Sequence, residues 1–200
     1  MLEVRDLSYM NYLAHIFFAD RTPLSIFGNL LGDFVKGKIT GKFPKKLESG
    51  IINHRKIDKF TDSHATTFSS RKFIRTERYR FSGIIVDVAY DHFLSKNWNR
   101  FSSVELTEFI DSTYELMENE PPGIDNDTLI HLRKMRTEDW LSSYSSIEGI
   151  DKAFKRISAR IKRKNSLGSA IEDIVENCLE LENNFLRFFP ELICFINERD

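Results

Sequence analysis

Histidine and aspartate residues stand inside strongly apolar segments of this sequence, where burial without a partner would be costly. Asp87 and Asp91 are four residues apart in IIVDVAYDHFL, and His92 follows directly. Residues four apart share one face of a helix, and a carboxylate is rarely buried unless it is paired or bound to a metal ion. This segment is therefore expected to need a cation or strong polar partners.

The same pattern recurs in three other segments. His54 and Asp58 are four apart in NHRKIDKFTD, and Asp62 lies one turn further on. Asp33 interrupts the run GNLLGDFV, and His15 lies within YLAHIFF. Imidazole and carboxylate ligands gathered from several helices suit Mn²⁺, Fe²⁺, Zn²⁺ or Mg²⁺, with positions left open for water and a phosphate group. The pattern thus predicts a metal site.

Simpler interpretations of these residues stay open. His15 is compatible with a histidine of the core, and His54 with Asp58 is compatible with a surface pair worth about 0.3–0.5 kcal/mol. Asp87 could pair with an arginine such as Arg55. The sequence carries no CxxC or HExxH signature that would decide between these interpretations.

The net charge is only −1, but the basic residues are clustered. They form two stretches, which are Arg71, Lys72, Arg75, Arg78 and Arg80, and Lys152, Lys155, Arg156, Arg160, Lys162, Arg163 and Lys164. Positive surface of this kind attracts an acidic partner, although either stretch is equally compatible with a solvated helix face. Arg55, with one or more of Arg75, Arg78 and Arg80, could clamp phosphate oxygens.

Apolar periodicity predicts helices through most of the chain, and no stretch alternates as a strand would. The predicted helices span 22–37, 45–62, 81–98, 103–119, 125–139, 147–164 and 167–197, with a turn at 63–67 and a break near Pro190. Nine Gly and five Pro in 200 residues also favour helices. We expect an all-α, single-domain helical bundle over residues 10–200, preceded by a tail or alternative start at 1–9.

Other features predict a soluble cytoplasmic protein without membrane association. No apolar run is long enough to span a bilayer, and the N-terminus lacks a signal-peptide pattern. Cys178 and Cys194 have no CxxC spacing, which predicts reduced, buried thiols.

Four motifs, in this order, closely resemble the acyl carrier protein phosphodiesterase family. They are MNYLAH at 10–15, GNLLGDFVKG at 28–37, HRKID at 54–58 with Thr61-Asp62, and RFSGIIVDVAYDHFLSKNW at 80–98. The match continues more weakly to FFPEL at 188–192. That family is similar to divergent HD-domain metallohydrolases, so the resemblance implies an HD-domain-like helical bundle.

The resemblance also implies an activity. It is hydrolysis of the phosphodiester that joins 4′-phosphopantetheine to a serine of holo-acyl carrier protein, with a divalent cation, Mn²⁺ as first choice, and a small, strongly acidic protein as substrate. By motif position the metal ligands would be Asp33, His54, Asp91 and His92. The residues that orient ligands, hold phosphate or transfer protons would be His15, Arg55, Asp58, Asp62 and Asp87. His and Asp are adjacent only as Asp91-His92, the reverse of the usual HD order.

Two alternatives remain at this point. An HD-like phosphohydrolase would act on a nucleotide or small phosphodiester, and a non-catalytic protein would bind acyl carrier protein and use the His/Asp cluster structurally. Nucleic-acid binding through residues 152–164 is weaker, because the total charge is near zero and no known motif occurs there.

Overall fold

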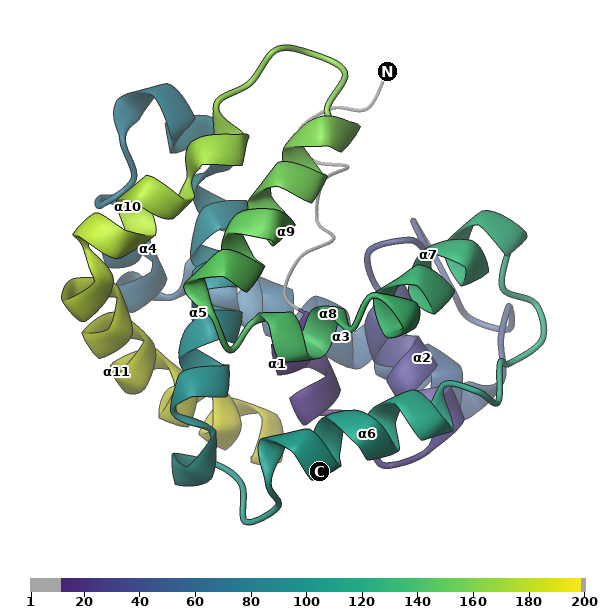
Figure 1. Ribbon diagram of the computed structural model, residues 1–200. Helices are drawn as coiled ribbons and strands as arrows, with labels where there is room; N and C mark the ends of the chain where they lie inside the picture. The colour runs from purple at the N-terminus through teal and green to yellow at the C-terminus, as the bar shows by residue number, and fades with distance from the viewer. Residues whose placement is uncertain (1–11, 199–200) are drawn as a thin grey trace. The chain divides into compact units, whose positions relative to one another are not determined.

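The computed structural model describes residues 12–198, so the expected N-terminal tail at 1–9 lies outside the described part. Helices and their connections make up the described residues, and no strand occurs among them (Figure 1). This confirms the predicted all-α fold class. The HD-domain-like relationship and the single-domain organisation stay predictions.

The chain divides into two compact units. The first, called the α2 unit here, consists of Tyr12–Ile57 and Asn97–Ser142. The second, the α5 unit, contains Asp58–Lys96 and the chain from Ser143 onward. Helix α3 (Lys45–Ser63) begins in the α2 unit and ends in the α5 unit as one continuous helix, and its bounds confirm the helix predicted at 45–62.

The α2 unit is a set of short helices around an apolar core. Its other elements are α1 (Tyr12–Phe17), α2 (Pro23–Leu31), η3 (Trp98–Arg100), α6 (Leu106–Leu116), α7 (Asn126–Thr137) and α8 (Trp140–Ser143). Helix α2 begins as predicted, because the Thr22 hydroxyl accepts a hydrogen bond from the Ser25 amide and Pro23 occupies the first turn.

The predicted extension of this helix to Gly37 is wrong. Helix α2 ends at Leu31, and the chain then turns, with the amides of Phe34 and Val35 both donating to the Leu31 carbonyl. Arg55 lies on α3, and its guanidinium donates hydrogen bonds to the main-chain carbonyls of Val35 and Gly37. These long-range bonds satisfy groups that a longer helix would have paired internally.

In the α5 unit, α5 (Ser82–Lys96) is the central helix, as its apolar sequence predicts. Ile85, Val88 and Phe93 are completely buried, and the helix contacts α4, α9, α11 and η2. The remaining elements of this unit are α4 (Ala65–Arg71), η2 (Thr76–Phe81), α9 (Ile147–Arg160), η4 (Leu167–Ser169), α10 (Ile171–Glu176) and α11 (Cys178–Asn197).

Two local expectations in this unit are wrong. Residues 63–67 were expected to form a turn, but α4 begins at Ala65, with Nδ1 of His64 accepting a hydrogen bond from the Thr66 amide as its cap. The C-terminal helix breaks at Asn177, and Pro190 lies inside the continuous α11. Phe188 and Phe189 beside that proline are buried, so packing there outweighs the hydrogen bond that proline cannot make.

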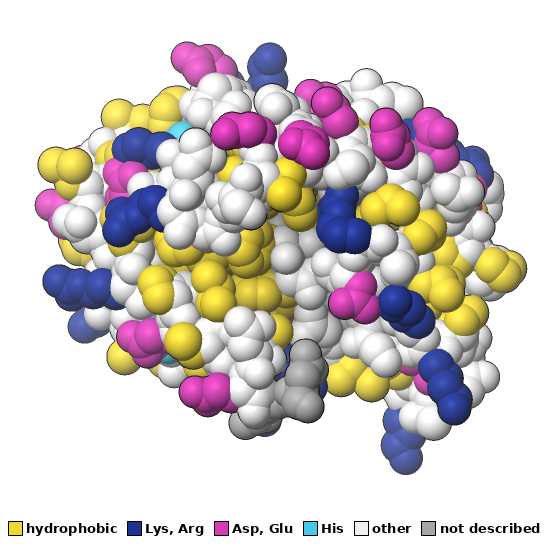
Figure 2. Space-filling model, turned by 90° about the horizontal axis from the view of Figure 1, so that it is seen from below, with side chains coloured by type: hydrophobic (Ala, Val, Ile, Leu, Met, Phe, Trp, Pro, Cys, Tyr) yellow, Lys and Arg dark blue, Asp and Glu magenta, His cyan; other side chains and the backbone are white. Residues whose placement is uncertain are grey.

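The surface of the molecule is mixed in character. Figure 2 shows a face on which hydrophobic side chains gather, with basic and acidic side chains both present around them. Cys178 is half-buried and Cys194 is exposed, so the prediction that both thiols are buried is wrong. Among the described residues, no helix is long and apolar enough to cross a membrane.

Candidate metal centre

The centre is built around His54 of α3, whose imidazole contacts residues of α1 and of the segment at the end of α2. His15 of α1 stacks its ring on that of His54, with the ring centroids 3.7 Å apart and the planes 13° from parallel. Oδ1 of Asp33, in the turn after α2, lies 3.2 Å from Nε2 of His54. All three residues are buried. The structure therefore brings together residues from three separate apolar segments.

The hydrogen bonds of His54 determine which of its ring nitrogens carries a proton. Nδ1 lies 2.7 Å from the main-chain carbonyl oxygen of Asn29, and a carbonyl can only accept, so Nδ1 is the donor. In a neutral imidazole, Nε2 then presents a lone pair to the carboxylate of Asp33. Two acceptors face each other at 3.2 Å, and this arrangement needs a proton or a metal ion between them.

Glycines hold α2 and α3 close enough for these contacts. A Cβ at Gly28 would lie 2.4 Å from the Leu47 carbonyl oxygen, and one at Gly50 would lie 2.8 Å from Gly28 Cα. At Gly32 an added Cβ would lie 2.1 Å from the ring of His54. Only glycine at these positions leaves room for the imidazole against the end of α2.

Asp58 adds a carboxylate to the same face of α3. It lies one helical turn beyond His54, so the continuous helix fixes their relationship. His15, His54 and Asp58 each offer one ligand atom, and these atoms lie within 4.8 Å of one another. Two imidazoles with one or two carboxylates are a donor set that Mn²⁺, Fe²⁺ or Zn²⁺ accepts, so these residues fit a divalent transition metal.

A second group of carboxylates lies in the α5 unit around Asp87. Burial raises the pKa of Asp87 well above its usual value, and the negative charges of Asp58 and Asp62 raise it further, while Arg71 acts in the opposite direction. Asp91 also contributes to the upward shift. Arg71 forms an ion pair with Asp62, whose side chain is mostly exposed. Asp87 therefore keeps its proton to higher pH than an ordinary aspartate.

Asp91 and His92, predicted as metal ligands, lie on α5. Asp91 is completely buried, and His92 is nearly so. Nδ1 of His92 donates to the main-chain carbonyl of Tyr144 at 2.7 Å, and burial is the main cause that lowers the pKa of this imidazole. The neutral ring therefore leaves Nε2 as its possible ligand atom. The metal-binding role of both residues stays a prediction.

The structure gives the four predicted phosphate-binding arginines different surroundings. Arg55 donates to the main-chain carbonyls of Val35 and Gly37 and so fastens the turn that contains Asp33. Arg75 and Arg78 pair with carboxylates of α10, and Arg78 is buried there. The fourth, Arg80, is exposed. These contacts favour positioning or structural roles for the first three, and phosphate binding stays a prediction.

Sequence reasoning missed Asn29 and Gly32. The Asn29 side chain bonds to the Ser25 carbonyl and to Asn53 on α3, and its own main-chain carbonyl orients His54. The polar Asn29 inside the apolar run GNLLGD could have been recognised as a candidate from the sequence. Its main-chain carbonyl, which orients His54, could not, because every residue type has one. The structure also groups His15 and Asp58, expected to orient ligands or transfer protons, with the possible ligands.

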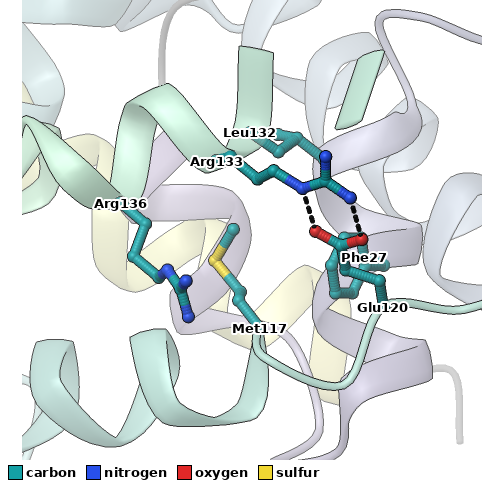
Figure 3. A pocket seen from close by; sticks show the side chains of 6 residues that line it. All are labelled: Phe27, Met117, Glu120, Leu132, Arg133 and Arg136. Atoms are coloured by element: carbon teal, nitrogen blue, oxygen red, sulfur yellow. Dashed lines mark hydrogen bonds and ion pairs between the residues drawn. The ribbon is translucent and has the colours of Figure 1, made fainter. Parts of the chain in front are cut away.

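A small pocket elsewhere in the α2 unit carries two arginines but no part of this centre (Figure 3). Nε and Nη2 of Arg133 each donate to the carboxylate of Glu120 at 2.6 Å, and Arg136 pairs with Glu118 at 3.0 Å. Both charges are compensated locally. The pocket therefore belongs to the connection between α6 and α7.

The described residues form an all-helical protein in which buried histidine and aspartate side chains of separate segments contact one another. The comparisons with known proteins are more specific. A family model described as acyl carrier protein phosphodiesterase matches residues 10–192. The chain belongs to this family.

The chain is similar to several curated proteins over nearly its whole length. It is 31% identical over 190 residues to the acyl carrier protein phosphodiesterase of Klebsiella pneumoniae strain 342, which covers 92% of this chain and 96% of that protein. The proteins of the same name from Escherichia coli O157:H7 and Enterobacter sp. strain 638 are 32% and 30% identical over the same shares. No solved structure matches the chain.

Proposed function

We propose that this protein is a cytoplasmic, metal-dependent phosphodiesterase that converts holo-acyl carrier protein to apo-acyl carrier protein and 4′-phosphopantetheine. Family membership supports the substrate and the bond that is cleaved. The observation that carries the metal is the contact between Nε2 of His54 and Oδ1 of Asp33 at 3.2 Å. An imidazole nitrogen and a carboxylate oxygen that face each other in this way are the kinds of donor atom that a divalent transition metal binds.

The residues that would hold the ion are His54, Asp33, His15 and Asp58, and Mn²⁺ is the first candidate. When bound, a divalent ion would make a water molecule more acidic and would offset negative charge on the substrate phosphate. Nδ1 of His54 is held by the Asn29 carbonyl, so Nε2 keeps its lone pair and its direction. Arg55 secures the turn that presents Asp33.

Asp87 is suited to the role of general acid. Its pKa is raised mainly by burial, and it lies within electrostatic reach of Asp58. A carboxylic acid that keeps its proton to higher pH than an ordinary aspartate can give it to the departing serine oxygen of the carrier protein. In this scheme Asp58 is a ligand and Asp87 is the acid, so the two aspartates take different roles because their surroundings differ.

The first test is the intact mass of holo-acyl carrier protein after incubation with the protein. Loss of one 4′-phosphopantetheine group with Mn²⁺, and no loss with a chelator, is the expected result. The His54→Ala variant should be inactive with metal, while His64→Ala, which changes a helix cap in the α5 unit, should keep most activity. Unchanged carrier mass with Mn²⁺, Mg²⁺, Fe²⁺ and Zn²⁺ would reject the proposal.

The other outcomes separate the alternatives. Turnover of a small phosphodiester without cleavage of the carrier would favour a general phosphohydrolase. Binding of the carrier without any change in its mass would favour a non-catalytic role. An Asp91→Asn variant that retains Mn²⁺ affinity but loses turnover would show that Asp91 is needed for the reaction and is not a metal ligand.

A further inference from the structure

The two basic stretches of the chain differ in how far their charge is compensated. In the first, Arg75 pairs with Glu172 and Glu176 at 2.7 Å each. Arg78 is buried and donates from Nε to Asp173 at 3.1 Å. The carboxylates of α10 thus neutralise the middle of this stretch and fix it to the fold, and it offers little positive field to a partner.

The second stretch begins at Lys152 within α9 and continues into the loop that follows this helix. Between Lys152 and Lys164 the sequence contains seven basic and no acidic residues. Lys162, Arg163 and Lys164 in the loop are exposed. Among the described residues, no carboxylate lies within ion-pair distance of these three side chains, whereas Lys155 pairs with Asp151. The loop therefore concentrates uncompensated positive charge in a molecule whose net charge is −1.

This loop is held in a defined conformation. The Asn165 side chain donates to the carbonyls of Ser158 and Arg163, and it accepts from the Ser158 hydroxyl and the Leu167 amide. The Ser166 hydroxyl donates to the Glu77 carbonyl. A charged loop that is already ordered loses less conformational entropy when it binds a partner than a flexible one would.

Arg80 extends the same surface from η2. Its guanidinium lies 3.5 Å from the main-chain carbonyl of Lys164 and stands over the ring of Phe81 at 4.5 Å. The Glu77 side chain nearby interacts with Arg78 at 3.6 Å. Four exposed basic side chains thus lie on adjacent segments, and we name them the basic loop: Arg80, Lys162, Arg163 and Lys164.

We infer that the basic loop is the docking surface for the acidic face of the carrier protein substrate. This inference rests on the proposed function, which supplies a small and strongly acidic protein as the partner. Opposite charges at the edge of an interface accelerate association and orient the partner, and their effect weakens as salt is added. The loop therefore binds the carrier's protein surface and takes no part in the chemical step.

The test compares two variants with the same change in charge. Lys162→Glu/Arg163→Glu/Lys164→Glu reverses the charge of three of the four basic-loop residues, and Lys72→Glu/Arg100→Glu/Arg187→Glu reverses the charge of three exposed basic residues elsewhere. Three measurements are made on each: kcat and KM for holo-acyl carrier protein at several salt concentrations, affinity for apo-acyl carrier protein, and hydrolysis of bis(p-nitrophenyl) phosphate. Circular dichroism checks that both variants are folded.

The loop variant should raise KM and weaken apo-carrier binding by about tenfold or more, with kcat and small-diester hydrolysis within about twofold of the parent. Its KM should also depend less on salt. Equal effects of the two variants would overturn the inference. So would a result in which the loop substitutions weaken binding to anionic vesicles or duplex DNA but leave binding to the carrier unchanged. If the parent protein binds the carrier but does not cleave it, the proposed function fails while the binding comparison still decides the role of the loop.

Discussion

The main-chain carbonyl of Asn29 accepts a hydrogen bond from Nδ1 of His54 at 2.7 Å, and this bond determines what the other face of the imidazole can do. With its proton committed to Nδ1, the neutral ring offers a lone pair at Nε2, where Oδ1 of Asp33 lies 3.2 Å away. The acceptor on α2 thus orients the imidazole so that Nε2 of His54 faces Asp33.

This relationship predicts opposite effects of Asp33→Asn on stability and on metal binding. The amide of asparagine can donate to Nε2 of His54, so the metal-free variant should be as stable as the parent or more stable. Its Mn²⁺ affinity should fall by about tenfold to a hundredfold, because an amide is a weaker ligand than a carboxylate. Thermal unfolding with chelator and with Mn²⁺ measures both effects.

The exposed Asp111→Asn on α6 is the matched control and should change neither quantity. A clear loss of stability of Asp33→Asn in chelator, with unchanged Mn²⁺ affinity, would contradict the prediction. That result would show that Asp33 pairs with a protonated His54, and the centre would then be a buried ion pair.

Gly32→Ala should displace His54 without removing any ligand. The added Cβ would lie 2.1 Å from the ring, so either the imidazole or α2 must shift. Overpacking of this kind costs about 1–3 kcal/mol of unfolding free energy, and the displaced imidazole should bind Mn²⁺ more weakly. Urea denaturation and Mn²⁺ titration test the two parts.

Gly83→Ala in α5 is the control for this change, because its added Cβ would meet only the end of the Arg71 side chain, at 3.4 Å. In a helix this substitution should be neutral or slightly stabilising. If Gly32→Ala behaves as this control does, the close contact with His54 is not a constraint on the centre.

Much of this fold could be predicted from the sequence, because it depends on the residue pattern within each segment. The 3.6-residue periodicity of α3 and the apolar character of α5 on most sides are properties of the segments themselves. The end of α2 depends instead on Arg55, which is distant in sequence, and the continuity of α11 through Pro190 depends on tertiary packing. Such long-range effects override local signals.

The candidate site divides in the same way. That His54 and Asp33 would need polar partners followed from their apolar surroundings, and spacing placed Asp58 on the face of His54. The stacking of His15 on His54 joins α1 to α3, and the close approach of α2 to α3 at Gly28 depends on packing; no spacing rule contains either contact. Asp173 neutralises the charge of Arg78 although the two residues are far apart in sequence. Sequence alone therefore could not predict this ion pair when it indicated Arg78 as a phosphate-binding residue.

Arg78→Met should destabilise the α5 unit strongly. Arg78 bonds to Asp173, Ser169 and Glu172, and Asp173 is completely buried. Removing one member of a buried ion pair costs about 3–5 kcal/mol, and Arg75 should keep the loss near the lower end because its Nε also lies 3.2 Å from Asp173. Urea unfolding measures the loss.

A double-mutant cycle with Asp173→Asn checks the cause of that loss. If the ion pair is responsible, the two substitutions together should cost clearly less than the sum of the single losses. Strict additivity would show that Arg78 stabilises the unit through its other contacts. The exposed Arg187→Met on α11 should be close to neutral.

The raised pKa of Asp87 predicts that the stability of the folded protein depends on pH in a characteristic way. Its pKa in the folded protein is raised well above 3.8, mainly by burial, so between these two values the folded state holds a proton that the unfolded state has released. Stability must therefore fall as pH rises from 3.8 through that interval. The Asp87→Asn variant lacks this proton, and its unfolding free energy in chelator should decline less over the same range, while Asp111→Asn should follow the parent. Urea denaturation at a series of pH values gives the comparison, and parallel curves for the parent and Asp87→Asn would show that Asp87 titrates as an ordinary aspartate and is unsuited to be the general acid.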